Sequence, residues 1–149
     1  MRPPEQDVGT SIDLAIYRMD CAAEDLRVAK LLMENGAYKT TINRAYYAIF
    51  HAITALHSLN NRAYKRHKDT LGNFNKLYIH TGVFPKEWGG KVMEAEAARH
   101  SSDYGDFYNP TNEEAQKQLD FASHFVHTVK SYFESQLAER NTECLGEGK

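Results

Sequence analysis

Apolar side chains recur at steps of three and four along most of this chain, which is the spacing of one face of an α-helix. The runs predict helices over about residues 10–34, 37–59, 66–80, 85–102 and 111–138. No run shows the strict alternation of a half-buried strand, and no internal repeat is visible. We therefore expect an all-α fold, an up-and-down bundle of four to five helices.

Local signals mark the ends of these helices. Thr10–Asp13 and Thr111–Glu114 have the pattern of a capping box, and Asn35–Gly36 is a natural helix stop. Pro85 suits a first turn, although the glycines that follow at 89 and 90 each weaken a helix by about 1 kcal/mol relative to alanine. The last helix has apolar steps of four and three, which indicates a bundle seam.

The second predicted helix has two different faces. Arg44 and His51 are two helical turns apart with Tyr47 between them, so a cation, a phenol and an imidazole share one face. The opposite side carries the apolar positions Ile42, Ala45, Ile49, Ala52, Ile53 and Leu56. We expect the apolar stripe to enter the core, and the polar trio to be available to a ligand, a partner subunit or water.

The length of 149 residues suits one domain with a real core. We expect a flexible N-terminus over 1–10, a helical bundle over 11–138 and a flexible tail over 139–149, where periodicity is lost.

Composition narrows the function classes. A formal charge of −2 excludes a protein that is basic throughout, and a mean hydropathy of −0.62 favours a soluble chain. No run has the length of a membrane span and the first residues lack the apolar core of a signal peptide, so we expect a cytoplasmic protein without membrane contact. Cys21 and Cys144 are expected to be free thiols, His124 and His127 structural, and no metal or cofactor is indicated.

Positive charge is concentrated in one region. Between Arg62 and Lys91 there are seven Lys or Arg residues against two acidic ones. Lys65, Arg66 and Lys68 are the candidate RNA-binding residues, because such a patch can follow a phosphate backbone. The alternative is an ordinary solvated helix face.

Several of these residues together resemble the HEPN superfamily. The resemblance rests on Asn43–Ala52, then His67, Phe74 and Thr81–Gly82, then Ala98–Arg99 and Asp103–Tyr104. It covers about residues 12 to 135 and is strongest for the small single-domain prokaryotic branch, related to HEPN toxins paired with minimal nucleotidyltransferases. The resemblance implies a HEPN-like helical bundle that forms a homodimer. It also implies RNA or a nucleotide as ligand, and a minimal nucleotidyltransferase antitoxin as a partner.

The family's catalytic motif is an Arg followed, after four to six residues, by a His, and Arg44 and His51 fit it with six between them. In the family these residues face each other across the dimer axis and form a composite site. The resemblance therefore implies a metal-independent endoribonuclease, a toxin or defence effector. RNA supplies its own 2′-hydroxyl nucleophile, so His51 would serve as acid or base and Arg44 would hold the phosphate.

Other residues are assigned supporting roles. Tyr47 and Asn43 would orient the imidazole or the phosphate, and the family pattern adds Arg99, Asp103 and Tyr104 as a brace. Two positions depart from the family. Ala45 stands where many active members have a polar residue, and Ile53 where toxins paired with adenylylating antitoxins have a tyrosine. The alternative function is a non-catalytic module that binds a nucleotide, RNA or a partner such as the nucleotidyltransferase.

Overall fold

The computed structural model describes the backbone of residues 7–147 and the side chains of residues 11–141. It contains α1 (Asp7–Glu34), α2 (Tyr38–Leu59), α3 (His67–Phe74) with a π-helical extension η2 (Asn75–Ile79), α4 (Trp88–Tyr104) and α5 (Asn112–Glu147). No strand occurs in this part of the chain. The all-α bundle predicted from the sequence is confirmed.

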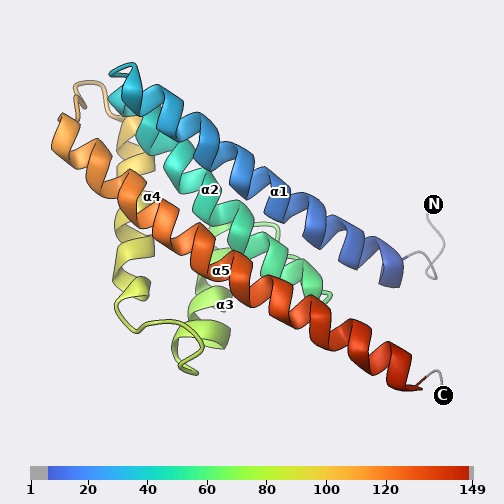
Figure 1. Ribbon diagram of the computed structural model, residues 1–149. Coiled ribbons are helices and arrows are strands. Elements are labelled where there is room, and N and C mark those ends of the chain that lie inside the picture. The colour runs from blue at the N-terminus through green and yellow to red at the C-terminus, as the bar shows by residue number, and fades with distance from the viewer. Residues whose placement is uncertain (1–6, 148–149) are drawn as a thin grey trace, which may run out of the picture.

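The three longest helices run side by side. α1 and α2 form an antiparallel hairpin, and α5 lies along both of them so that its end returns to the side where α1 begins (Figure 1). The shorter α3 and α4 cover the remaining side of α2. α2 is thus the central helix, and its polar stripe is its only incompletely covered face among the described residues.

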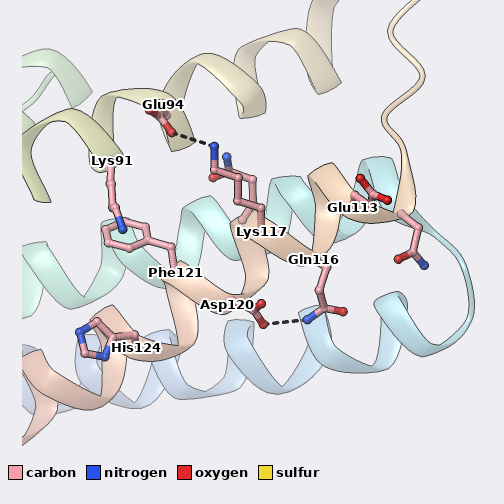
Figure 2. A pocket seen from close by; sticks show the side chains of 10 residues that line it. Lys91, Glu94, Glu113, Gln116, Lys117, Asp120, Phe121 and His124 are labelled. Atoms are coloured by element: carbon pink, nitrogen blue, oxygen red, sulfur yellow. Dashed lines mark hydrogen bonds and ion pairs between the residues drawn. The ribbon is translucent and has the colours of Figure 1, made fainter. Parts of the chain in front are cut away.

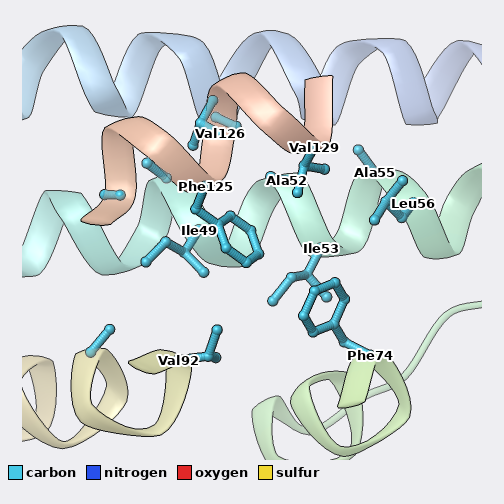
Figure 3. Packing of buried hydrophobic residues seen from close by; sticks show 14 of the residues in the cluster. Ile49, Ala52, Ile53, Ala55, Leu56, Phe74, Val92, Phe125, Val126 and Val129 are labelled. Atoms are coloured by element: carbon cyan, nitrogen blue, oxygen red, sulfur yellow. The ribbon is translucent and has the colours of Figure 1, made fainter. Parts of the chain in front are cut away.

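The core has the composition that the apolar pattern predicts. The six apolar positions expected to face inward from α2 are all at most 1% exposed. All of them except Ile42 belong to one cluster with Phe74 of α3, Val92 of α4 and Phe125 of α5 (Figure 3). Full burial of one such aliphatic side chain stabilises the fold by about 1.5–3 kcal/mol. The core therefore fixes the rotation of α2, and with it the direction in which Arg44 and His51 point.

The starts of two helices, α1 and α4, differ from the sequence prediction. α1 begins at Asp7, ahead of the capping box expected at Thr10–Asp13, so part of the expected flexible segment 1–10 is helical; residues 1–6 lie outside the described residues. α4 begins at Trp88, whereas the sequence predicted that it begins at Pro85. The N-cap half of the capping box predicted at Thr111 is confirmed, because the Thr111 hydroxyl accepts a hydrogen bond from the backbone N–H of Glu114 at 3.1 Å.

α5 continues as helix to Glu147, through most of the segment 139–149 that the sequence predicts to be a flexible tail. Extending an existing helix costs far less than starting one, because each added residue gains a hydrogen bond. Arg140 also ties this end to the loop after α2, donating to the Asn60 side-chain oxygen at 2.7 Å. Periodicity is therefore lost here without loss of the helix.

Candidate active site

The polar stripe of α2 lies beside α1, and side chains of the two helices meet along it. The Arg44 side chain is 35% exposed and the His51 side chain 29% exposed, so both reach solvent while part of each is covered. The Arg44 guanidinium lies over the Tyr47 ring at 5.0 Å, and the Tyr47 and His51 rings are 6.1 Å apart. The three side chains that share a face in the sequence are therefore a continuous surface.

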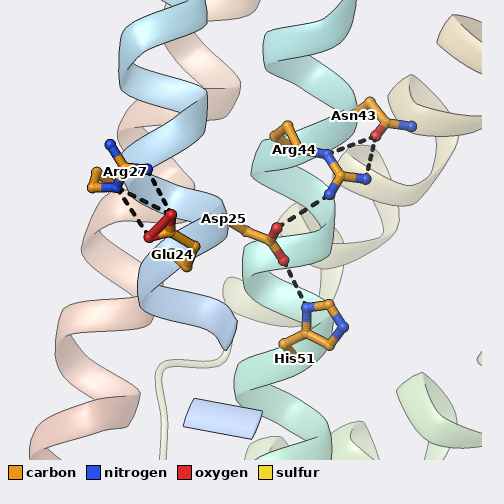
Figure 4. A network of polar contacts seen from close by, with 6 residues as sticks. All are labelled: Glu24, Asp25, Arg27, Asn43, Arg44 and His51. Carbon is orange, nitrogen blue, oxygen red and sulfur yellow. Dashed lines mark hydrogen bonds and ion pairs between the residues drawn. The ribbon is translucent and has the colours of Figure 1, made fainter. Parts of the chain in front are cut away.

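A carboxylate from α1 joins the two candidate catalytic residues. Asp25 Oδ1 accepts a hydrogen bond from Arg44 Nη1 at 3.1 Å, and its Oδ2 lies 2.7 Å from His51 Nδ1 (Figure 4). Asp25 is only 14% exposed, so water competes weakly for its oxygens. One carboxylate thus holds the guanidinium and the imidazole in fixed positions relative to each other.

This contact defines the chemistry open to His51. A carboxylate can only accept, so Nδ1 carries the proton and donates it to Asp25. Nε2 remains available on a ring that is partly exposed to solvent. A neutral imidazole held in this way can accept a proton at Nε2, and its cation can return one.

A second chain of contacts links the stripe to α4. The Asn43 side-chain oxygen accepts two hydrogen bonds from Arg44, at 3.1 and 2.8 Å, while its amide donates to Asp103 Oδ1 at 2.8 Å. Asp103 also pairs with Arg99 Nη1 at 3.3 Å. The residues predicted as a brace therefore meet, with the exception of Tyr104. That side chain is 68% exposed and its ring packs on His100 instead.

A second imidazole lies on the other side of Tyr47. His67, at the start of α3, stacks on Phe50 at 4.0 Å and is 6.1 Å from Tyr47. Burial raises the pKa of Tyr46, so its hydroxyl keeps its proton, and it forms a hydrogen bond with His67 Nδ1 at 3.1 Å. Burial, and then the nearby Arg99 cation, lowers the pKa of His67. His67 is therefore a neutral imidazole next to the stripe.

The predicted RNA-binding residues flank this second imidazole. Lys65 and Arg66 are exposed, and Arg66 forms an ion pair with Asp69 at 3.0 Å. Lys68 lines an apolar-walled pocket of about 260 Å³ between α3 and α4, together with Glu96. His67 packs against Tyr47 and Phe50 of α2. The basic residues next to it in the sequence, Lys65, Arg66 and Lys68, therefore lie near the polar stripe of α2. The positive charge is partly offset, since an acidic side chain accompanies both Arg66 and Lys68.

A pocket larger than the one at Lys68 lies elsewhere, between α4 and α5 (Figure 2). It has a volume of about 600 Å³, and an ion pair between Glu94 and Lys117 at 3.7 Å crosses it. Lys91 lies over the Phe121 ring at 5.6 Å. Three acidic residues line it against two lysines, namely Glu94, Glu113 and Asp120 against Lys91 and Lys117. This balance of charges does not favour the binding of a polyanion such as RNA. None of the candidate site residues lines this pocket.

The remaining chemical candidates have structural partners. His124 packs edge-on against Trp88 at 5.8 Å, and His127 contacts the Ser123 carbonyl oxygen at 2.8 Å. Cys21 is a free thiol, while the Cys144 side chain lies outside the described ones. In the described part of the chain, no three His, Cys, Asp or Glu residues are grouped so as to hold a metal ion. No described helix has the length and apolarity needed to cross a membrane.

Sequence reasoning missed two residues of this network. Asp25 interrupts the apolar pattern of the first helix, and a carboxylate at such a position could have indicated a polar contact with a neighbouring helix. His67 belongs to the string of residues that carries the family resemblance, but its place beside Tyr47 follows only from the packing of α3 on α2. Both residues are distant in the sequence from the side chains that they contact.

Comparison with known proteins identifies relatives over most of the chain. The HEPN domain family matches residues 17–132. A protein of Methanocaldococcus jannaschii named "Putative toxin MJ0605" is 33% identical over 112 residues, which is 75% of this chain and 83% of that protein. A UPF0332 protein of Thermotoga maritima is 29% identical over 113 residues, 76% of this chain and 86% of the relative. A second Methanocaldococcus protein, "Putative toxin MJ0142", is 27% identical over 115 residues, covering 77% of this chain and 78% of its own.

Proposed function

Because the chain belongs to the HEPN domain family, we propose that it is a metal-independent endoribonuclease, with Arg44 and His51 acting at a site completed by a second copy of the chain. The observation that carries the proposal is the pair of contacts made by the Asp25 carboxylate, one to Arg44 and one to His51, which holds both residues of the motif in place. An ordinary pair of surface side chains has no need of a shared, nearly buried carboxylate.

The proposed reaction uses the 2′-hydroxyl of RNA as nucleophile. His51 Nε2 accepts the hydroxyl proton, the 2′-oxygen attacks the adjacent phosphorus, and the bond to the 5′-oxygen breaks. A 2′,3′-cyclic phosphate remains on one product and the other leaves with a 5′-hydroxyl. The His51 of the second copy, in its protonated form, donates the proton to the leaving 5′-oxygen. Arg44 stabilises the negative charge on the phosphate oxygens in the transition state.

The arrangement supports a dimeric site in physical terms. Asp25 contacts one side of both Arg44 and His51, and the two side chains remain 35% and 29% exposed to solvent. The stripe is also the least covered face of the central helix. A two-fold symmetric dimer that forms through this face of α2 would bring the polar stripes of the two copies together. Dimerisation is tested by sedimentation at micromolar concentration, where a purely monomeric protein contradicts the composite site.

The relatives named as putative toxins favour a role as a toxin or defence effector. The nucleotidyltransferase partner is proposed from the family resemblance alone. Ile53, which occupies the position of the modified tyrosine in the related toxins, is fully buried in the core. Silencing by adenylylation at that position is therefore not part of the proposal. A partner would act by binding, and co-purification of the two proteins from one host is the test.

The proposal is tested by incubating the purified protein with mixed RNA in EDTA, beside Arg44→Ala and His51→Ala variants. We expect the wild type to cleave RNA and both variants to lose at least about 100-fold in rate, the usual size of acid–base and electrostatic contributions. Lys39→Ala, an exposed cation on the same helix, is the matched control and should cleave normally. Equal cleavage by wild type and variants, or none by the wild type, would leave the alternative of a binding module.

A further inference from the structure

A small polar pocket lies between α1, α2 and the loop that follows α2. Its volume is about 60 Å³, several times the 10–15 Å³ or so that one ordered water needs. Arg18 of α1, Thr54 and His57 of α2, and Arg62 and Tyr64 of the following loop contribute to its walls. Among the side chains that the structure describes, no carboxylate lines it. The pocket is therefore polar, cationic and without an internal counter-charge.

Two nitrogen atoms at this pocket lack hydrogen-bond partners. The His57 side chain is 1% exposed; its Nε2 donates to the Thr70 carbonyl oxygen at 3.0 Å, and its Nδ1 has no partner among the described residues. Arg18 Nε is likewise buried and unpaired within the described part of the chain. Buried polar atoms are nearly always paired. Two of the three unpaired side-chain atoms among the described residues, Arg99 Nε being the third, belong to side chains that line this pocket, which favours an additional polar partner there.

The pocket is aligned with the candidate active site. Arg44, Tyr47, His51 and Thr54 follow one another at steps of three and four along α2, and the Thr54 hydroxyl donates to the His51 carbonyl oxygen at 2.9 Å. Arg18 lies two helical turns from Asp25 on α1, or about 10 Å at 1.5 Å per residue. One or two nucleotides of single-stranded RNA span about that distance.

We propose that this pocket binds a backbone phosphate of the RNA substrate, one or two nucleotides from the phosphate that is cleaved. Arg18 and Arg62 supply the positive charge, and the pocket fixes the register of the strand relative to His51. This inference rests on the proposed ribonuclease function for the identity of the ligand, whereas the anion-binding chemistry of the pocket follows from its own residues.

Binding would also change the protonation of His57. Burial, followed by the charge of Arg62, lowers the pKa of the imidazole, although the hydrogen bond to Thr70 opposes this shift. The charged and titratable groups around it are Arg18 from α1, Arg62 and Tyr64 from the loop, and Tyr78 from η2. A phosphate in the pocket favours the imidazolium, whose Nδ1–H can then donate to it. Binding is therefore expected to take up a proton.

The first test uses inorganic phosphate as probe. Phosphate should move the imidazole NMR signals of His57 and raise the midpoint of thermal unfolding in the wild type. In Arg18→Gln and Arg62→Gln, the phosphate affinity should fall about tenfold or more. Arg62 is exposed, so its variant should fold normally even if the Arg18 variant does not. Arg27→Gln, which removes an exposed charge from the same helix as Arg18, is the control and should bind phosphate like the wild type.

The second test uses RNA that carries 2′-O-methyl groups and so cannot be cleaved. Arg62→Gln should weaken its binding several-fold and reduce the slope of log affinity against log salt by about 1, as expected for one lost phosphate contact. With cleavable RNA, KM should rise while kcat stays near the wild-type value.

The outcomes separate this inference from the function on which it rests. Phosphate binding that depends on Arg18 and Arg62, in a protein that cleaves no RNA, would support the pocket and remove the ribonuclease. Cleavage in EDTA with phosphate and RNA affinities unchanged in both variants would overturn the pocket and leave the ribonuclease standing. A wild type that binds no phosphate in the millimolar range, its two nitrogens being satisfied by water alone, would also overturn it.

Discussion

Replacing Asp25 with asparagine keeps the shape of the side chain and removes the charge that joins Arg44 to His51. In the structure the carboxylate makes one contact of 3.1 Å to the guanidinium and one of 2.7 Å to the imidazole. The amide of asparagine can satisfy one of them with its oxygen, but its NH2 group faces a second donor. We expect the imidazole to lose its fixed orientation, and the guanidinium its anchor.

The size of the effect follows from these contacts. A hydrogen bond between charged groups contributes about 1.5–3 kcal/mol net. The lower half of that range applies, since Arg44 is 35% and His51 29% exposed and water replaces part of the loss. At about 1.4 kcal/mol per factor of ten, kcat should fall by about 10- to 30-fold. The free energy of unfolding should fall by about 1–2 kcal/mol, which lowers the melting temperature by a few degrees.

The assay is cleavage of a fluorescent RNA in EDTA, at a temperature well below the melting point of the variant. A purely structural defect would lower the amount of active protein, so the fraction of folded protein and the RNA affinity are measured alongside kcat. Glu24→Gln is the control, because it makes the same charge change at the neighbouring, exposed position, where Arg27 is the partner. Asp25→Glu should restore part of the rate. An Asp25→Asn kcat within twofold of the wild type, or an equal loss in Glu24→Gln, would refute the reasoning.

Three further predictions concern the fold. Phe125 is fully buried and packs on Trp88 at 4.6 Å, so Phe125→Ala should cost about 3–5 kcal/mol in urea unfolding; a loss below 1 kcal/mol would contradict this core. Thr111→Ala removes the N-cap of α5 and should cost about 1 kcal/mol by thermal unfolding, whereas Thr111→Ser should cost little. Because burial lowers the pKa of His57, the unfolded chain binds this proton more readily. Stability should therefore decline as pH falls below about 6.5, and decline less in His57→Gln; a steeper decline in that variant would reverse the sign.

The amino-acid sequence by itself determined the elements that depend on local order. Apolar steps of three and four predicted the helices, and the Thr111 capping box predicted where α5 begins. The same periodicity separated the buried and polar faces of α2. These features are predictable because helix formation, capping and the direction of side chains depend on residues within about one turn.

The family, too, could be recognised from the order and spacing of motif residues, and the match over residues 17–132 confirms it. The end of α5 was the weakest boundary. Loss of apolar periodicity after Ala138 indicates that no face is patterned for burial, but it does not mark the end of the helix, which continues to Glu147.

Only the tertiary structure decided which side chains meet across helices. Asp25 reaches Arg44 and His51 over 19 and 26 positions of sequence, His67 reaches Tyr46 over 21, and Arg18 and His57 line one pocket. Such meetings depend on the rotation and offset of one helix against another, which the packing of the whole core fixes. The sequence therefore determined that α2 carries a polar stripe, and the packing of α1 and α3 against it decided which side chains contact that stripe.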